Sequence, residues 1–202
     1  MHYDRFTRLL HIVIACGIMT QMVGSLVMIH PKPGRQGDLF YAMHETWGQV
    51  VLGVLVIHWI WSMVRPGSIA FAQLFPWFSL ARYRAIQEDI KQFATHAVRF
   101  RLPDATQPSP LASAIHGLGL IVATLLGMSG VILFLGISKN GAMVGWVHAV
   151  KEAHEVFGSV LWVYLMAHAC MGILHQLSGH GSMIAMIKVW KKNPSPLQTS
   201  PV

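Results

Sequence analysis

Four long apolar stretches, each free of charged residues, dominate the pattern of hydrophobic and polar positions along the chain. They cover about residues 9–29, 46–64, 111–137 and 156–177. A helix needs about 20 apolar residues to cross the hydrocarbon core of a bilayer, which is about 30 Å thick. The pattern therefore predicts an all-α membrane protein, a bundle of four transmembrane helices. With their flanking turns, these helices are expected at about 8–29, 44–64, 111–137 and 153–177.

A weaker pattern lies between the second and third apolar stretches, where the sequence predicts an amphipathic segment over about 79–101. Its apolar residues recur at helical spacing: Leu80, Tyr83, Ile86, Ile90, Phe93 and Ala97. Such a segment either lies along the cytoplasmic membrane surface or is an ordinary connector. Residues 1–190 are expected to form one domain, and 191–202, which include Asn193-Pro-Ser-Pro, a disordered cytoplasmic tail.

Composition supports the membrane interpretation and adds an orientation. Charged residues make up 11% of the chain, against about 25% in typical soluble domains. Lys and Arg favour cytoplasmic loops, and a cytoplasmic N-terminus places eleven of the 15 there: Arg5, Arg8, Arg65, Arg82, Arg84, Lys91, Arg99, Arg101, Lys188, Lys191 and Lys192. Both termini are thus expected in the cytoplasm. The net charge of +7 is interpreted as this bias and not as a nucleic-acid surface.

Histidines inside the apolar stretches are the main chemical signal. The sequence His-Glu-x-x-Gly occurs at His44 and again at His154, and each time a further histidine, His58 or His168, follows fourteen residues later. Fourteen residues advance a helix by about 21 Å and return to within about 40° of the same face. Each of these two helices therefore presents histidines at two depths. A histidine in a membrane span is costly and usually has a partner in the bundle interior.

Pairing across the bundle follows from these depths. The second and fourth helices run in the same direction, so His44 and His154 come to one depth, near the outer side. Two facing imidazoles can bind a haem iron axially, and Gly48 and Gly158 would leave room for the macrocycle. At the inner depth, His168 has three candidate partners: His11, His58 and His116. Depth alone does not choose among them. His-Glu-x-x-His and structural zinc spacings are absent.

These motifs give the chain a resemblance to a known family. Arg8-x-x-His11 in the first helix, His44-x-x-x-Gly48 in the second, and His154-Glu-x-x-Gly158 with His168 in the fourth resemble the bacterial cytochrome b561 family. That group is related to the b-type cytochrome subunits of membrane-bound nickel–iron hydrogenases and formate dehydrogenases. The resemblance covers about residues 5–190.

The resemblance implies two haem b groups, the inner held by His11 and His168 and the outer by His44 and His154. His58 departs from the family pattern, which more often has an arginine near a haem there. It would pair with a propionate or be a ligand itself. Arg8 is a candidate to neutralise an inner propionate. His116 matches a family histidine outside the ligand set, with a role near quinone or a propionate.

The expected function is electron transfer across or within the bacterial cytoplasmic (inner) membrane, between a donor and the quinone pool. The donor would be a periplasmic dehydrogenase or cytochrome subunit, or a small reductant such as superoxide. Whether the chain is an electron carrier or a quinone-linked oxidoreductase subunit stays open. The alternative from another class is a transporter or a proton or metal channel that uses the intramembrane histidines.

Overall fold

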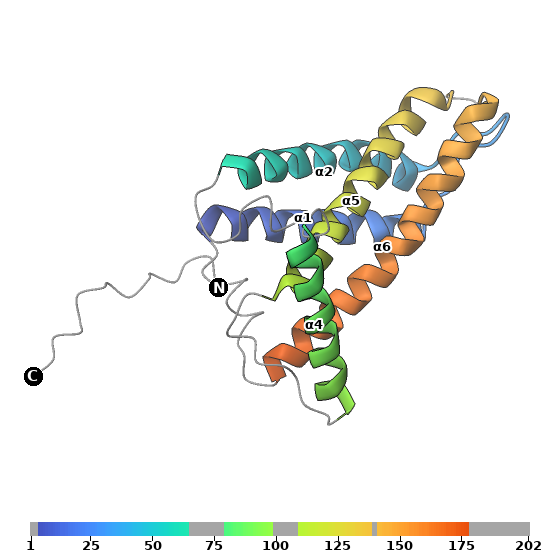
Figure 1. Ribbon diagram of the computed structural model, residues 1–202. Coiled ribbons are helices and arrows are strands. Elements are labelled where there is room, and N and C mark those ends of the chain that lie inside the picture. The colour runs from blue at the N-terminus through green and yellow to red at the C-terminus, as the bar shows by residue number, and fades with distance from the viewer. Residues whose placement is uncertain (1–3, 65–78, 99–108, 139–140, 178–202) are drawn as a thin grey trace, which may run out of the picture.

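Helices make up the regular structure of the protein in the computed structural model, which describes residues 4–64, 79–98, 109–138 and 141–177. These are α1 (Arg5–Ser25), α2 (Leu39–Val64), α4 (Leu80–Val98), α5 (Pro110–Gly136) and α6 (Gly145–Leu177), shown in Figure 1. All except α4 are long and apolar enough to cross a membrane. The predicted all-α fold with four candidate spans is confirmed, and the described ranges contain no β-strand.

Helix boundaries differ from the apolar stretches mainly where polar residues continue the helical turn. The helix α2 begins at Leu39 and α6 at Gly145, both earlier than expected, because a helix can extend beyond the hydrocarbon core into a polar environment. In α6 this extension is supported by a Lys151–Glu155 ion pair at i,i+4 spacing. The predicted tail, 191–202, lies outside the described residues, as does the end of the predicted amphipathic segment.

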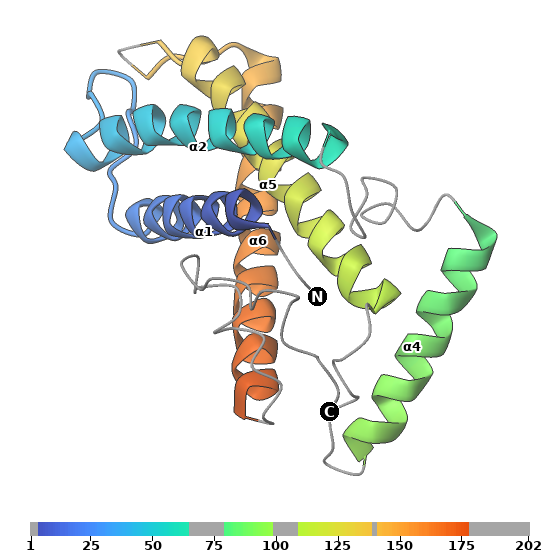
Figure 2. The same cartoon turned by 90° about the vertical axis from the view of Figure 1, so that its left-hand side faces the viewer.

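The four long helices form two antiparallel pairs. The helices α1 and α2 lie side by side, and the α5–α6 pair crosses them at a large angle, as Figure 1 and the rotated view in Figure 2 both show. The contacts between α2 and α5 join the two pairs. The shorter α4 lies beside the N-terminal part of α5.

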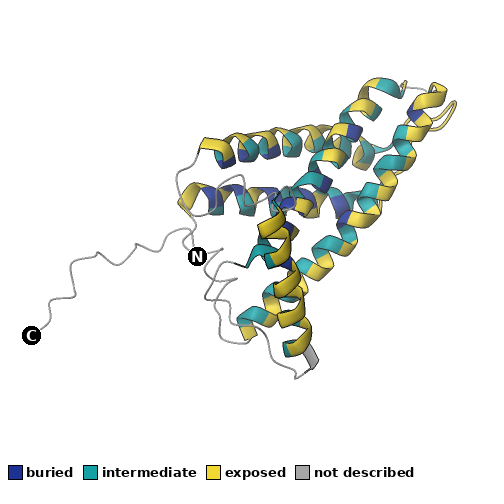
Figure 3. Ribbon diagram, in the orientation of Figure 1, coloured by how far each residue is buried: buried dark blue, intermediate teal, exposed yellow. Residues whose placement is uncertain are grey.

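The core lies where the pairs cross and draws on every long helix. Its buried members are Ile14, Ile18 and Met22 of α1, Leu55 of α2, Val122 and Ala123 of α5, and Leu161 of α6. Outside this core, large apolar side chains on all four helices are exposed, as the yellow outer faces in Figure 3 indicate. An apolar exterior of this extent is what a lipid-facing surface requires.

Small residues and interhelical hydrogen bonds bring the helices together. A Cβ atom on Gly17 would lie 2.7 Å from Cγ2 of Val51, so α1 and α2 approach closely there. The Trp59 indole donates to the Thr124 hydroxyl (3.0 Å), which joins α2 to α5. The Trp61 indole donates to the Thr7 hydroxyl of α1 (3.0 Å).

The predicted amphipathic segment is confirmed as a helix, α4. Its Ile86 is buried, whereas Leu80, Tyr83 and Ile90 of the same apolar series are exposed. Asp89 fastens α4 to the start of α5, because its carboxylate accepts hydrogen bonds from the Ser109 hydroxyl (2.8 Å) and the Leu111 N–H (3.1 Å).

Candidate functional site

The structure holds two pairs of half-buried histidines, and α6 contributes one ring to each pair. The rings of His44 on α2 and His154 on α6 have centroids 6.4 Å apart. The rings of His11 on α1 and His168 on α6 also have centroids 6.4 Å apart. The fourteen-residue spacing on α6 thus places two similar pairs at two levels, with partners from the α1–α2 hairpin.

The separation within each pair suits a shared metal ion. An imidazole nitrogen binds a metal at about 2.0 Å, so two rings on opposite sides of one ion have centroids about 6 Å apart. Among the described residues, no group of three or more His, Cys, Asp or Glu side chains could hold a metal ion. Each pair would therefore supply two ligands, and a metal ion held there would take its remaining ligands from another group.

Polar side chains from neighbouring helices contact the His44–His154 pair. The Ser129 hydroxyl of α5 lies 2.9 Å from Nδ1 of His154. From α1, the Gln21 amide nitrogen donates to Nδ1 of His44 (2.8 Å) and to the His44 carbonyl oxygen (3.1 Å), and the amide oxygen accepts from the Gly48 N–H (3.0 Å). The sequence analysis did not single out Ser129 or Gln21. A polar residue in a charge-free span was the available signal, but which neighbour it faces depends on tertiary packing.

The glycines that follow this pair differ in their surroundings. A Cβ atom on Gly158, one turn after His154, would meet nothing within 4 Å. A Cβ atom on Gly48, one turn after His44, would have only the Gln21 amide within that distance, at 3.7 Å from its oxygen. Open space beside both histidines agrees with the room that a flat group needs next to its ligands.

The second pair has a third histidine and a tyrosine beside it. The His116 ring of α5 has its centroid 5.3 Å from that of His168. The Tyr164 ring stacks on His168, with 5.5 Å between the centroids and 13° between the planes. Gly119 permits this arrangement, because a Cβ atom there would lie 2.2 Å from Cζ of Tyr164. The structure thus places the His116 ring next to that of His168. The sequence analysis did not identify Tyr164.

The remaining predicted site residues lie on the same helices as the pairs. Arg8 is half-buried on α1, three residues before His11 and hence on the same side of that helix. His58 is buried on α2 with 8% of its surface exposed, and its carbonyl oxygen accepts from the Ser62 hydroxyl (2.8 Å). Their functional roles stay predictions.

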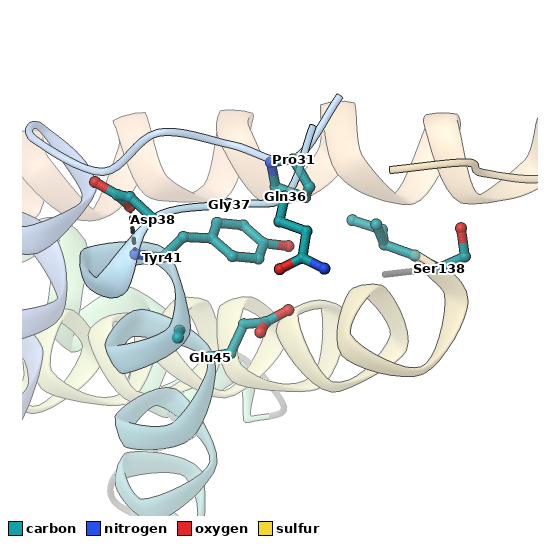
Figure 4. Close-up of a pocket in the computed structure, with 9 residues that line it drawn as sticks. Pro31, Gln36, Gly37, Asp38, Tyr41, Glu45 and Ser138 are labelled. Carbon is teal, nitrogen blue, oxygen red and sulfur yellow. Dashed lines mark hydrogen bonds between the residues drawn. The ribbon is translucent and has the colours of Figure 1, made fainter. Parts of the chain in front are cut away.

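A cavity of about 370 Å³ opens next to the start of α2, close in sequence to His44. Figure 4 shows the Tyr41 ring lying beneath the loop that carries Gln36 and Gly37, with Glu45 below it. The lining residues are Pro31, Gln36, Gly37, Asp38, Tyr41, Ala42, Glu45, Ile137 and Ser138. The cavity thus offers carboxylate, amide, phenol and hydroxyl groups at the end of the molecule that carries the His44–His154 pair.

Asp38 shapes the rim of this cavity. Its carboxylate accepts from the Tyr41 N–H (2.9 Å), which caps α2, and from the Ile29 N–H (3.0 Å) near the start of the loop between α1 and α2. The Tyr41 hydrogen bond, the largest influence, together with the one from Ile29 and the charge of Arg35, holds the pKa of the Asp38 carboxyl below its ordinary value.

Comparison with known proteins gives one match over nearly the whole chain. A family model described as prokaryotic cytochrome b561 matches residues 2–188. No curated protein and no solved structure matches the chain.

Proposed function

Since the chain belongs to the prokaryotic cytochrome b561 family, and is therefore a membrane b-type cytochrome of electron transfer, we propose that it binds two haem b groups and carries electrons between a donor and the quinone pool. His44 and His154 hold one haem in this proposal, and His11 and His168 hold the other. The observation that carries it is the equal 6.4 Å centroid separation of the two pairs.

The residues around the His44–His154 pair fit a bound haem. Open space at Gly158 would accept the edge of a flat macrocycle. Binding through Nε2 requires a proton on Nδ1 of each imidazole. For His44 to take that form the Gln21 amide would have to turn over, because its nitrogen donates to Nδ1 in the orientation that satisfies all three of its contacts.

The ligand set defines the kind of chemistry. Bound haem supplies an iron centre that gains or loses one electron, and two histidine ligands leave that iron no open position, which suits electron transfer rather than oxygen binding. His154 and His168 are about 21 Å apart along α6 by helical rise. The chain would thus hold its two redox centres at different depths of the cytoplasmic membrane.

The proposed orientation assigns each end of the molecule to one side of the membrane. With both termini in the cytoplasm, the His44–His154 pair and the cavity beside it lie toward the outer side. A donor would act there, either a periplasmic dehydrogenase or cytochrome subunit or a small reductant such as superoxide. Quinone would be the other terminus. Arg8 and His58 would pair with propionates of the inner haem, and His116 would lie near quinone or a propionate.

A haem count on purified variants tests this proposal. The wild-type protein is expected to contain two haem b groups per chain by pyridine haemochrome assay. His44→Ala and His154→Ala should each lose the same haem, and His11→Ala and His168→Ala the other. His148→Ala, on an exposed residue of α6, is the matched control and should keep both.

Two further variants test the assignment of the haem ligands. The haem content of the wild-type protein tests the alternative function, a transporter or channel. His58→Ala and His116→Ala are expected to keep both haems. Loss of the inner haem in either one, with retention in His11→Ala, would replace His11 as the ligand. A colourless wild-type protein would refute the electron-transfer proposal and favour a transporter or channel in which the histidines form a relay.

A further inference from the structure

Ser129 is a buried hydroxyl whose two neighbours allow its proton to be placed. It lies on α5 with 7% of its surface exposed. Its Oγ is 2.9 Å from the Leu126 carbonyl oxygen of its own helix and 2.9 Å from Nδ1 of His154 on α6. A carbonyl oxygen can only accept, whereas a hydroxyl has one proton to donate and lone pairs that accept.

The hydrogen-bond donors available around Ser129 indicate which nitrogen of the His154 imidazole carries the proton. The Ser129 proton goes to the Leu126 carbonyl, so Oγ is left to accept, and the donor facing it is Nδ1–H of His154. The Ser129 contact therefore selects the tautomer with the proton on Nδ1 and a free lone pair on Nε2.

We propose that Ser129 is a positioning residue that keeps His154 in this tautomer, so that Nε2 is the nitrogen presented for metal binding. The inference rests on the proposed function, because it assigns a role toward the haem held by His44 and His154. Histidine ligands of metals commonly donate their second N–H to an oxygen acceptor, which fixes the ring and raises its basicity.

The hydrogen bond also has an electronic consequence. A more basic imidazole stabilises the ferric state, so the Ser129 contact lowers the reduction potential of the haem that His154 binds. Among the described residues, no side-chain hydrogen bond reaches the rings of His11 or His168. The effect is therefore confined to one of the two haems.

The test is a redox titration of the purified holoprotein, followed by optical and electron paramagnetic resonance spectra. Ser129→Ala removes the acceptor with little change in volume. The haem that is lost in His44→Ala is expected to shift to a more positive midpoint potential, with altered g-values, while the other haem stays unchanged. The affinity of the protein for the haem that shifts should fall about 10- to 100-fold, as is typical when such a hydrogen-bond partner is removed.

Two control variants separate positioning from packing. Ser159→Ala, on α6, removes a hydroxyl that bonds only its own helix at the Glu155 carbonyl (3.0 Å), and should leave both potentials unchanged. Ser129→Thr keeps the hydroxyl and should keep the wild-type potential and g-values. Equal shifts in Ser129→Ala and Ser129→Thr would assign the effect to packing and overturn the inference.

The outcomes also separate this inference from the proposal beneath it. A wild-type protein without haem would refute the proposed function. A two-haem protein in which Ser129→Ala changes neither haem, or changes both alike, would leave the proposed function in place and refute the role of Ser129.

Discussion

At the residue scale, single polar side chains cap one helix and connect two others. Asp38 uses one carboxylate to cap α2 and to hold the start of the loop between α1 and α2. Ser129 uses one hydroxyl to connect α5 to a histidine of α6. The residue type alone does not reveal either role, because each role depends on the two groups to which the side chain is hydrogen-bonded.

The Asp38 cap should depend on pH. Because its pKa is lowered in the folded protein, the charged form stabilises the fold at pH values above the ordinary aspartate pKa, and this stabilisation is lost as pH falls through the folded value. Protection of the Ile29 and Tyr41 amides against hydrogen exchange, corrected for intrinsic rates, should therefore fall at acidic pH.

Asp38→Asn keeps a capping oxygen and removes the charge. Protection of the same two amides, measured by hydrogen exchange and corrected for intrinsic rates, is expected to be independent of pH in this variant. Asp38→Ala should lose protection at every pH. An Asn variant with the wild-type pH dependence would show that another group titrates.

At the element scale, glycines allow neighbouring helices to pack closely. The contact of Gly17 with Val51 sets the distance between α1 and α2, and these helices carry His11 and His44. The same holds between α5 and α6, where Gly119 accommodates the Tyr164 ring that stacks on His168. These glycines therefore set the distance between neighbouring helices and, with it, the distance between the histidines that those helices carry.

Gly17→Ala tests this link. The added Cβ would lie 2.7 Å from Cγ2 of Val51, a stiff β-branched side chain, so the helices must separate at a cost of about 1–3 kcal/mol. The thermal unfolding midpoint in detergent should fall. Gly24→Ala, on the same helix with nothing within 4 Å of the added atom, is the matched control. Equal midpoints for the two variants would contradict the prediction.

At the scale of the whole molecule, the apolar exterior fits a membrane, and the distribution of basic residues is the basis of the proposed orientation. The loop around 30–38 would face outward, and α4 would face the cytoplasm, since basic residues favour that side. Arg82, Arg84 and Lys91 of α4 suit a surface with anionic lipids.

This orientation predicts an asymmetric labelling pattern. In a background with Cys16 and Cys170 replaced by alanine, Gln36→Cys in the outer loop should react with a membrane-impermeant maleimide in intact spheroplasts. Gln92→Cys on α4, equally exposed, should react only after lysis. The reverse pattern would invert the proposed topology and move the donor to the cytoplasmic side.

Much of this protein follows from its sequence alone, because the information is local. Charge-free stretches of about 20 residues predict spans whatever their neighbours do, and the fourteen-residue spacing of His154 and His168 predicts two depths on one helix. The pairing of His44 with His154, predicted from depth, and that of His11 with His168, implied by the family resemblance, both have rings whose centroids lie 6.4 Å apart. Their roles as ligands stay predictions.

Only the tertiary structure decided which groups meet across helices. His116, set outside the ligand set by resemblance, lies closer to His168 by ring centroids than His11 does. Ser129 and Gln21 reach histidines of other helices, and α2 and α5 cross at a large angle rather than running parallel. Periodicity specifies the face of a helix, but the rotation and crossing of one helix against another depend on side-chain packing at contacts far apart in the sequence.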